Sequence, residues 1–281
     1  MKKIFLYRFL LVLLFSGMAV QHIDAVEPSD DVVTVTHPWH GVRVAYLGDS
    51  ITDPNTLKGA PIYWNFLQEW LEITPLVYGR GGHQWHQLLG QADRLQKEHG
   101  DDFDAIMIFL GTNDFNAGIP IGEWYEEETV TVNANGKMVE RVRRIPVFDQ
   151  STYRGRVNMA LDSLKRTYPS KQIVLLTPIH RAYAKFSERN VQPDESYQNS
   201  SGEYVDAYVE SVRQASAIWS VPVIDLHALS GLYPMHKEQE EYFPGGNDWL
   251  HPDSDGHRRL ALTIYYQLLT IPCRMDQTIR P

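Results

Sequence analysis

The stretch Tyr46-Leu47-Gly48-Asp49-Ser50-Ile51-Thr52 follows an apolar run at residues 42–46 and precedes a segment with helical spacing from about residue 61. A short apolar run of this kind indicates a buried strand. A strand that stops at a Gly-Asp-Ser turn leaves a serine hydroxyl at its carboxyl end, where open α/β sheets place their chemistry. Ser50 is therefore the candidate nucleophile.

Strands and helices are expected to alternate along the rest of the chain. Strands are predicted at residues 42–47, 76–78, 105–110, 173–178 and 221–226, and helices at about 61–73, 86–99, 152–168, 203–219 and 253–269. Short Val/Ile/Leu/Phe runs suit parallel strands that are covered on both faces. The pattern predicts an α/β fold, a three-layer α/β/α sandwich with a five-stranded parallel sheet and right-handed crossovers.

Three further blocks accompany Gly48-Asp49-Ser50. They are Gly79-Arg80-Gly81-Gly82, Gly111-Thr112-Asn113-Asp114 and Asp248-Trp249-Leu250-His251. In order and spacing, the four blocks resemble those of the SGNH (GDSL) hydrolase family of esterases and lipases, and the resemblance spans residues 42–270. It implies the SGNH hydrolase fold with a flavodoxin-like strand order 2-1-3-4-5.

A serine hydroxyl becomes an effective nucleophile when a histidine takes its proton and a third group holds that histidine. Asp248 and His251 can supply both functions, because they lie three residues apart on a loop that enters a helix. The alternative is a solvent-exposed histidine at a helix start and an aspartate in a turn. The other blocks favour the catalytic interpretation.

An oxyanion hole is expected beside Ser50. Asn113 follows the central strand, so its side-chain amide can donate to a tetrahedral intermediate; alternatively, Asn113 and Asp114 cap a turn. The backbone N–H of Ser50 and that of a glycine after the second strand would complete the hole. The resemblance assigns this second role to Gly82, with Gly81 as the alternative.

Aromatic residues and histidines are frequent around the four blocks. We predict that His83, Trp85 and Trp249 bind substrate, although Trp249 can instead pack beneath the catalytic loop. The histidines lack a helical HExxH pattern or a Cys/His cluster, so we predict no metal. The resemblance implies catalysis through an acyl-enzyme without a cofactor.

The first residues resemble a secretory signal. Positive charges at Lys2, Lys3 and Arg8 precede a charge-free apolar run at residues 9–20, which is short for a membrane span. We predict a signal peptide at residues 1–25, cleaved after Ala19 or Ala25, and a secreted or periplasmic product without stable membrane association. An uncleaved membrane anchor is the alternative.

The length of 281 residues and the hydrophobic content of 43% favour one catalytic domain, residues 26–281. The single cysteine, Cys273, cannot form an intramolecular disulfide. The formal net charge is −9, and Lys/Arg clusters are lacking, which disfavours nucleic acid as a partner. Neutral or weakly charged substrates fit better.

Three long segments interrupt the minimal fold, at residues 115–150, 179–202 and 227–247. The first contains an inserted β-hairpin, because alternating Thr/Val and Val/Arg arms flank an Asn-Gly turn. Long connections in a compact domain are usually functional. All three leave the carboxyl end of the sheet, so we expect them to form the walls of the substrate pocket.

The leading hypothesis is an exported serine esterase that hydrolyses O-acyl esters, especially acetyl esters on polysaccharide. A lipase or lysophospholipase would be expected to carry an apolar lid, and residues 115–150 are too charged for one. A thioesterase or arylesterase is a further alternative. From a different class, the chain could be a non-catalytic carbohydrate-binding protein on this fold.

Overall fold

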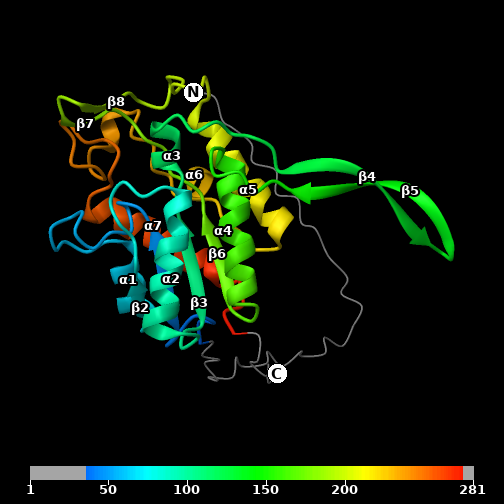
Figure 1. The fold of residues 1–281 in the computed structure, drawn as a ribbon. Coiled ribbons are helices and arrows are strands. Elements are labelled where there is room, and N and C mark those ends of the chain that lie inside the picture. Colours follow the sequence, from blue (N-terminus) through cyan, green and yellow to red (C-terminus); the bar gives the residue numbers. More distant parts are fainter. Residues whose placement is uncertain (1–35, 275–281) are drawn as a thin grey trace, which may run out of the picture. The chain divides into compact units, whose positions relative to one another are not determined.

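Five parallel strands form the central sheet, which Figure 1 shows in a computed structural model that describes residues 36–274. The strands are β1 (Arg43–Gly48), β2 (Thr74–Val77), β3 (Ala105–Phe109), β6 (Gln172–Leu176) and β9 (Val223–Ile224). Their order in the sheet is β2-β1-β3-β6-β9. The predicted α/β class and the strand order 2-1-3-4-5 are confirmed.

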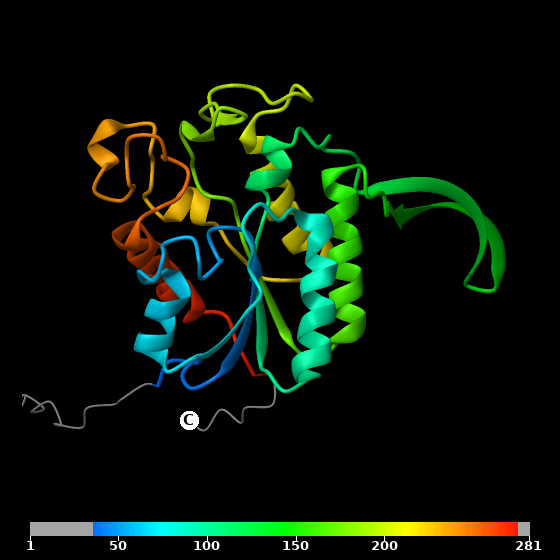
Figure 2. The same ribbon diagram turned by 60° about the vertical axis from the view of Figure 1, so that its left-hand side comes forward.

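Helices cover both faces of the sheet (Figure 2). One hydrophobic core joins alternate strand residues to α1 (Tyr63–Leu71) and α7 (Ser254–Leu268). The other joins the remaining strand residues to α2 (Leu88–His99), α4 (Tyr153–Thr167) and α5 (Val205–Trp219). Every residue of β3 and β6 is buried, because their side chains point alternately into the two cores.

The remaining helices within residues 36–274 are short. They are α3 (Thr112–Asn116), α6 (Leu226–Leu229) and two 3₁₀ turns, η1 (Trp85–Gln87) and η2 (Lys237–Gln239). In the register of β1 with β3, Gly48 is opposite Phe109, so these two strands end at the same edge of the sheet. The Gly-Asp-Ser and Gly-Thr-Asn-Asp blocks therefore leave that edge side by side.

The predicted hairpin is present as β4 (Tyr125–Ala134) and β5 (Lys137–Pro146), joined by Asn135 and Gly136 with positive φ angles of 53° and 80°. However, the expectation that it walls the substrate pocket is wrong. Figures 1 and 2 show it projecting from the α4 and α5 side of the molecule. The chain after α3 is held there by backbone hydrogen bonds from Tyr153 to Pro120 and from Arg154 to Ile121.

A second hairpin, β7 (Ala184–Ser187) and β8 (Asn190–Gln192), lies within the predicted segment 179–202. Its first strand runs beside the loop that carries Asp248, with backbone hydrogen bonds from Lys185 to Asn247 and from Trp249 to Tyr183. This segment therefore reaches the carboxyl edge of the sheet, as predicted.

No helix within residues 36–274 is long and apolar enough to cross a membrane. The predicted signal peptide at residues 1–25 lies outside the described residues.

Candidate active site

Ser50 lies in a tight turn after β1. The backbone N–H groups of Thr52 and Asp53 both donate to the carbonyl of Asp49, which curls the chain into a single turn with Ser50 inside it. Gly48 permits this turn because a Cβ atom there would lie 2.3 Å from Thr52 Oγ1 and 2.9 Å from the Phe109 carbonyl oxygen. The sequence at 48–52 thus fixes the Ser50 hydroxyl at the edge of the sheet.

A hydrogen-bonded relay connects Ser50 to the last sequence block. His251 Nε2 is 2.8 Å from Ser50 Oγ, and His251 Nδ1 is 2.9 Å from Asp248 Oδ2. Since Nδ1 faces a carboxylate, it carries the proton, and Nε2 is free to accept the Ser50 hydroxyl proton. The three residue types thus have the geometry that nucleophilic acyl transfer requires.

The loop around Asp248 holds the carboxylate in place. Its Oδ1 atom accepts the backbone N–H groups of Leu250 and His251 at 3.1 and 3.0 Å. Burial alone would raise the pKa of Asp248, but the hydrogen bonds from His251 and from the backbone outweigh it and lower the pKa. Asp248 therefore stays ionised and can stabilise a protonated His251.

Backbone donors lie on the turn after β2. The Gly81 N–H donates to Asp53 Oδ2 at 2.9 Å, so it is already satisfied. The N–H groups of Gly82 and Ser50 have no hydrogen-bond acceptor within residues 36–274. Gly82 also has a φ of 78°, a conformation that favours glycine. Of the two glycines that the sequence left open, the structure leaves only Gly82 with a free donor.

Asn113 lies between the serine turn and the Gly79–Gly82 block. Its Nδ2 donates to the His83 carbonyl at 3.0 Å and more weakly to Asp49 Oδ2 at 3.5 Å. The first bond fixes the amide. The second is at the limit of hydrogen-bond length, so it can be exchanged for a stronger acceptor at the reacting centre.

Buried polar residues that the sequence analysis did not identify tie the blocks together. Gln91 on α2 accepts the Gly48 N–H, donates to the Gly48 carbonyl and contacts His83 Nδ1, at 2.9, 2.8 and 2.8 Å. Arg156 on α4 pairs with Asp114 at 2.8 Å, and Asp114 also accepts the Trp85 N–H. These residues lie inside ordinary helical patterns, so only their tertiary contacts reveal the role.

Two carboxyl groups are buried under the site. Burial raises the pKa of Asp49 to about 7, although the Ile51 N–H and the nearby His251 oppose the rise. Burial also raises the pKa of Asp114 to about 6, against the hydrogen bonds from Arg156 and Trp85. Burial away from water therefore disfavours the ionised form of both carboxyl groups.

The predicted substrate-binding residues have different environments. His83 is half-buried, and burial together with Arg80 lowers its pKa. Trp249 is also half-buried and stacks on Phe243 with ring centroids 6.3 Å apart. The prediction for Trp85 is wrong, because its side chain is 1% exposed in the core and its Nε1 donates to Tyr153 Oη at 3.0 Å.

The β7–β8 hairpin supplies an aromatic side chain that the sequence analysis did not assign. Phe186 is 43% exposed, and its ring centroid is 5.3 Å from that of His251. Tyr183, just before β7, is 39% exposed. Phe186 thus presents an accessible aromatic face next to His251.

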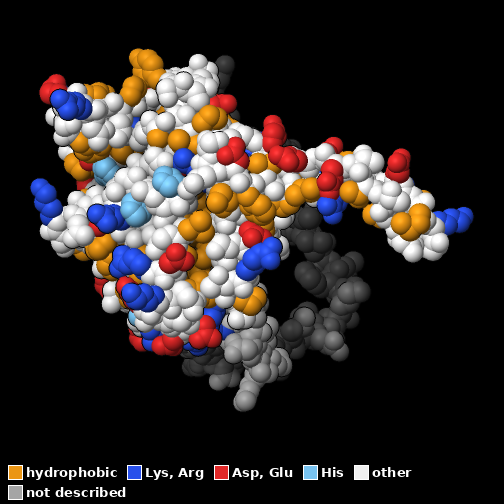
Figure 3. Space-filling model, viewed as in Figure 1, with side chains coloured by type: hydrophobic (Ala, Val, Ile, Leu, Met, Phe, Trp, Pro, Cys, Tyr) orange, Lys and Arg blue, Asp and Glu red, His pale blue; other side chains and the backbone are white. Residues whose placement is uncertain are grey.

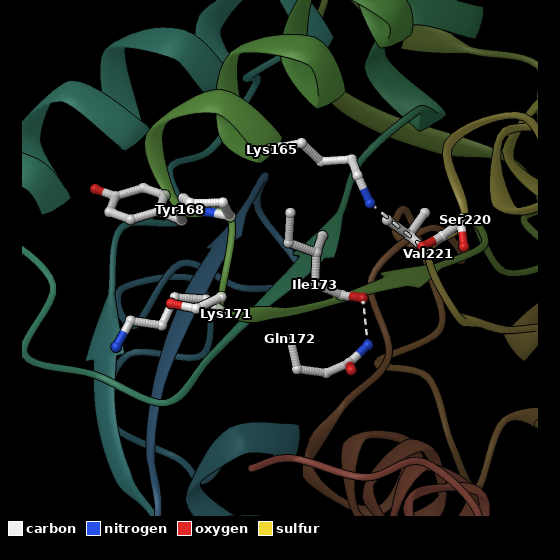
Figure 4. Close-up of a pocket in the computed structure, with 9 residues that line it drawn as sticks. Lys165, Tyr168, Lys171, Gln172, Ile173, Ser220 and Val221 are labelled. Atoms are coloured by element: carbon white, nitrogen blue, oxygen red, sulfur yellow. Dashed lines mark hydrogen bonds between the residues drawn. The ribbon is translucent and has the colours of Figure 1, made fainter. Parts of the chain in front are cut away.

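Two features bear on an alternative centre elsewhere in the described chain. Within residues 36–274 no group of three or more His, Cys, Asp or Glu side chains is placed to hold a metal ion. A pocket of about 340 Å³ lies at the amino-terminal end of β6, the edge opposite Ser50, and is lined by Lys165, Tyr168, Lys171 and Ser220 among others (Figure 4). It contains none of the four sequence blocks.

The comparisons with known proteins agree with this fold. The model of the GDSL-like Lipase/Acylhydrolase family matches residues 46–259. The chain therefore belongs to this family, whose members are acyl hydrolases that act on esters. The matched range includes all four blocks, from the serine turn to Asp248 and His251. A search of curated proteins finds no match.

Solved structures share the fold. A protein from Lactobacillus plantarum is 23% identical, with a TM-score of 0.62 over 82% of this chain and 97% of that one. A possible lipase from Chitinophaga pinensis is 20% identical, with a TM-score of 0.60 over 80% and 97%. Axe2, an acetylxylan esterase from Geobacillus stearothermophilus, is 17% identical, with a TM-score of 0.50 over 86% and 100%.

Proposed function

We propose that this protein is an exported serine esterase that removes small O-acyl groups, in particular acetyl, from carbohydrate. The observation that carries the proposal is the relay from Ser50 Oγ to His251 Nε2 at 2.8 Å and from His251 Nδ1 to Asp248 at 2.9 Å. These three residues carry the proton transfer and the nucleophilic attack.

In the first half of the proposed reaction, Ser50 Oγ attacks the ester carbonyl carbon while His251 Nε2 takes its proton. The carbonyl oxygen becomes an oxyanion and accepts hydrogen bonds from the N–H groups of Ser50 and Gly82 and from Asn113 Nδ2. Collapse of the intermediate breaks the ester C–O bond. The leaving alcohol takes the proton from His251, and the acyl group stays on Ser50.

In the second half, His251 Nε2 takes a proton from water, whose oxygen attacks the acyl carbon. Collapse returns the proton from His251 to Ser50 Oγ and releases the carboxylic acid. Asp248 remains ionised throughout and stabilises the protonated imidazole, in agreement with its lowered pKa. The cycle consumes one water for each ester bond and needs no cofactor.

The preference for a small acyl group is supported by the space behind Ser50. A void there is too small to hold a water molecule, and it is lined by Asp49, Ile51, Phe109, Leu110, Thr112, Pro178, Ile179 and Leu250. A long acyl chain that points into this void would have to displace the side chains that line it. This argues against the lipase and lysophospholipase alternatives.

The carbohydrate preference is supported by three observations. Phe186 presents an exposed aromatic face beside His251, Tyr183 is exposed on the same segment, and such faces suit sugar rings. The acidic chain favours neutral substrates over anionic surfaces. A structural neighbour with the same fold is an acetylxylan esterase.

The test measures acetate release from a panel of acetylated glycans together with a p-nitrophenyl ester series of increasing acyl length. We expect acetate release from at least one glycan, and turnover that falls steeply beyond short acyl chains. The Ser50→Ala variant should be inactive in both assays. Preference for long acyl chains would favour a lipase, thioester turnover would favour a thioesterase, and glycan binding without hydrolysis would favour a non-catalytic role.

A further inference from the structure

The β4–β5 hairpin, here called the arm, is unusual because it is long and projects from the body (Figures 1 and 2). Ten residues of each strand pair with one another over the whole length. The arm is anchored at its base, where Trp124 Nε1 donates to Gln214 on α5 at 2.8 Å and Val147 donates to the Trp124 carbonyl. A two-stranded hairpin without further packing is at best marginally stable in water.

The outer edge of β4 is available for pairing. Within residues 36–274, β4 pairs only with β5, so its other backbone edge has no strand partner. The centre of this edge reads Thr129-Val130-Thr131-Val132 and lacks the lysines and prolines that usually protect exposed edges. A residue pattern of this type favours addition of another strand.

The arm also has exposed apolar side chains. Met138 near the tip is 67% exposed and Val142 is 62% exposed. At the base, a groove of about 500 Å³ runs between the arm and α5 and is lined by Glu123, Trp124, Tyr125, Glu127, Arg144, Gln214, Ala217 and Ile218. An apolar tip and a partly apolar groove thus lie at opposite ends of one element.

Charges are divided between the two ends. Near the base, Arg144 pairs with Glu127 at 3.4 Å and Arg143 pairs with Glu128, so these charges are already compensated. Two further acids at the base, Glu123 and Glu126, have no ion pair within residues 36–274.

The outer half of the arm carries more positive than negative charge. In the outer half of the arm, Lys137 lies next to the turn and Arg141 lies opposite Val130. Neither has a carboxylate partner within residues 36–274, and Glu140 is the only acid in β5. Figure 3 shows basic and hydrophobic side chains together at the end of the arm. The base is therefore acidic with an apolar groove, and the tip is basic with an apolar side chain.

We propose that two copies of this chain associate through their arms, antiparallel about a two-fold axis, with their β4 edges facing each other. In this arrangement the basic tip of each arm reaches the acidic base of the other, and Met138 of each copy meets the groove beside α5 of its partner. The contact is isologous, because the same two surfaces meet twice. Both arms then belong to a four-stranded sheet.

The test is sedimentation velocity of the purified protein over a range of concentrations. The wild-type protein should sediment with twice the monomer mass. Two charge-reversed variants are compared with it, a tip variant (Lys137→Glu with Arg141→Glu) and a base variant (Glu123→Lys with Glu126→Lys). Each should be monomeric, with a dissociation constant raised at least about tenfold, because like charges then face each other. Circular dichroism and thermal melting establish that both variants are folded.

Mixing supplies the matched control. A tip variant and a base variant are complementary at both contacts, so an equimolar mixture should recover the dimer, as should the variant that carries all four substitutions. A wild-type protein that is monomeric at all concentrations would overturn the proposal, and so would dimers that persist in both charge-reversed variants. Loss of glycan retention by arm variants of a monomeric protein would instead make the arm a carbohydrate contact.

Discussion

His257 provides a sharp test of the packing beneath the turn that carries Ser50. The side chain is fully buried on α7, its Nδ1 accepts the Tyr63 N–H at 3.3 Å, and its Nε2 has no partner within residues 36–274. Burial, with a smaller contribution from His251, lowers the pKa of His257 to about 3. The change to make is His257→Asn, because the asparagine side chain can still accept from Tyr63 but cannot titrate.

The expected magnitude follows from the linkage between protonation and folding. An unfolded histidine has a pKa of about 6.5, so between about pH 6.5 and pH 3 the unfolded chain binds a proton at this position and the folded chain does not. The stability that the neutral buried ring contributes is complete above pH 6.5 and is lost as the pH falls. The free energy of unfolding should decrease by about 1.4 kcal/mol per pH unit from this group, or about 2 kcal/mol at pH 5.

The assay is urea denaturation of both proteins at about pH 8, 6.5 and 5. The variant should be less stable at pH 8, because it loses ring packing on Tyr63. Its loss of stability between pH 8 and pH 5 should nevertheless be smaller than that of the wild type by about 2 kcal/mol. Equal losses in the two proteins would mean that His257 becomes protonated in the folded state, and would refute the reasoning from burial.

Three further outcomes are expected. Asn113→Ala should lower kcat for p-nitrophenyl acetate by about 10²–10³-fold, the usual effect of removing one oxyanion donor. An unchanged kcat would show that Asn113 does not belong to the proposed oxyanion hole. Gly79→Ala should lower the melting temperature through an overpacking cost of about 1–3 kcal/mol. The reason is that the new Cβ would lie 2.5 Å from Thr52 Cβ and 2.9 Å from the Thr52 carbonyl carbon. An unchanged melting temperature would contradict the close packing of this turn. Dialysis against EDTA should leave ester turnover intact, and a loss that zinc restores would contradict catalysis by serine alone.

The fold and the meeting of the four sequence blocks were accessible from the sequence because their signals are local. Asp248 and His251 are three residues apart, and each of the other blocks is a short turn after a strand. Ser50 and His251 are 201 residues apart, yet their meeting follows from the predicted strand order, which brings the relevant loops to one edge of the sheet.

Features that depend on packing between distant elements were not predicted. Trp85 was assigned to substrate, although it precedes Leu88, Ala92 and Leu95 at helical spacing, a signal of the buried position that the structure shows. The direction of the arm had no local signal, because hydrogen bonds between residues 120–121 and the start of α4 determine it. Gln91 likewise reveals its role only through contacts with Gly48 and His83.

The central claim is that Ser50 is the nucleophile of an ester hydrolase, and its most direct test is covalent labelling with a fluorophosphonate followed by peptide mass mapping. We predict one adduct per chain, on Ser50, with loss of esterase activity in proportion to labelling. Ser50→Ala should not be labelled, and His251→Ala should be labelled far more slowly because no base takes the hydroxyl proton. An adduct on another residue, or full esterase activity in a folded Ser50→Ala variant, would contradict the account.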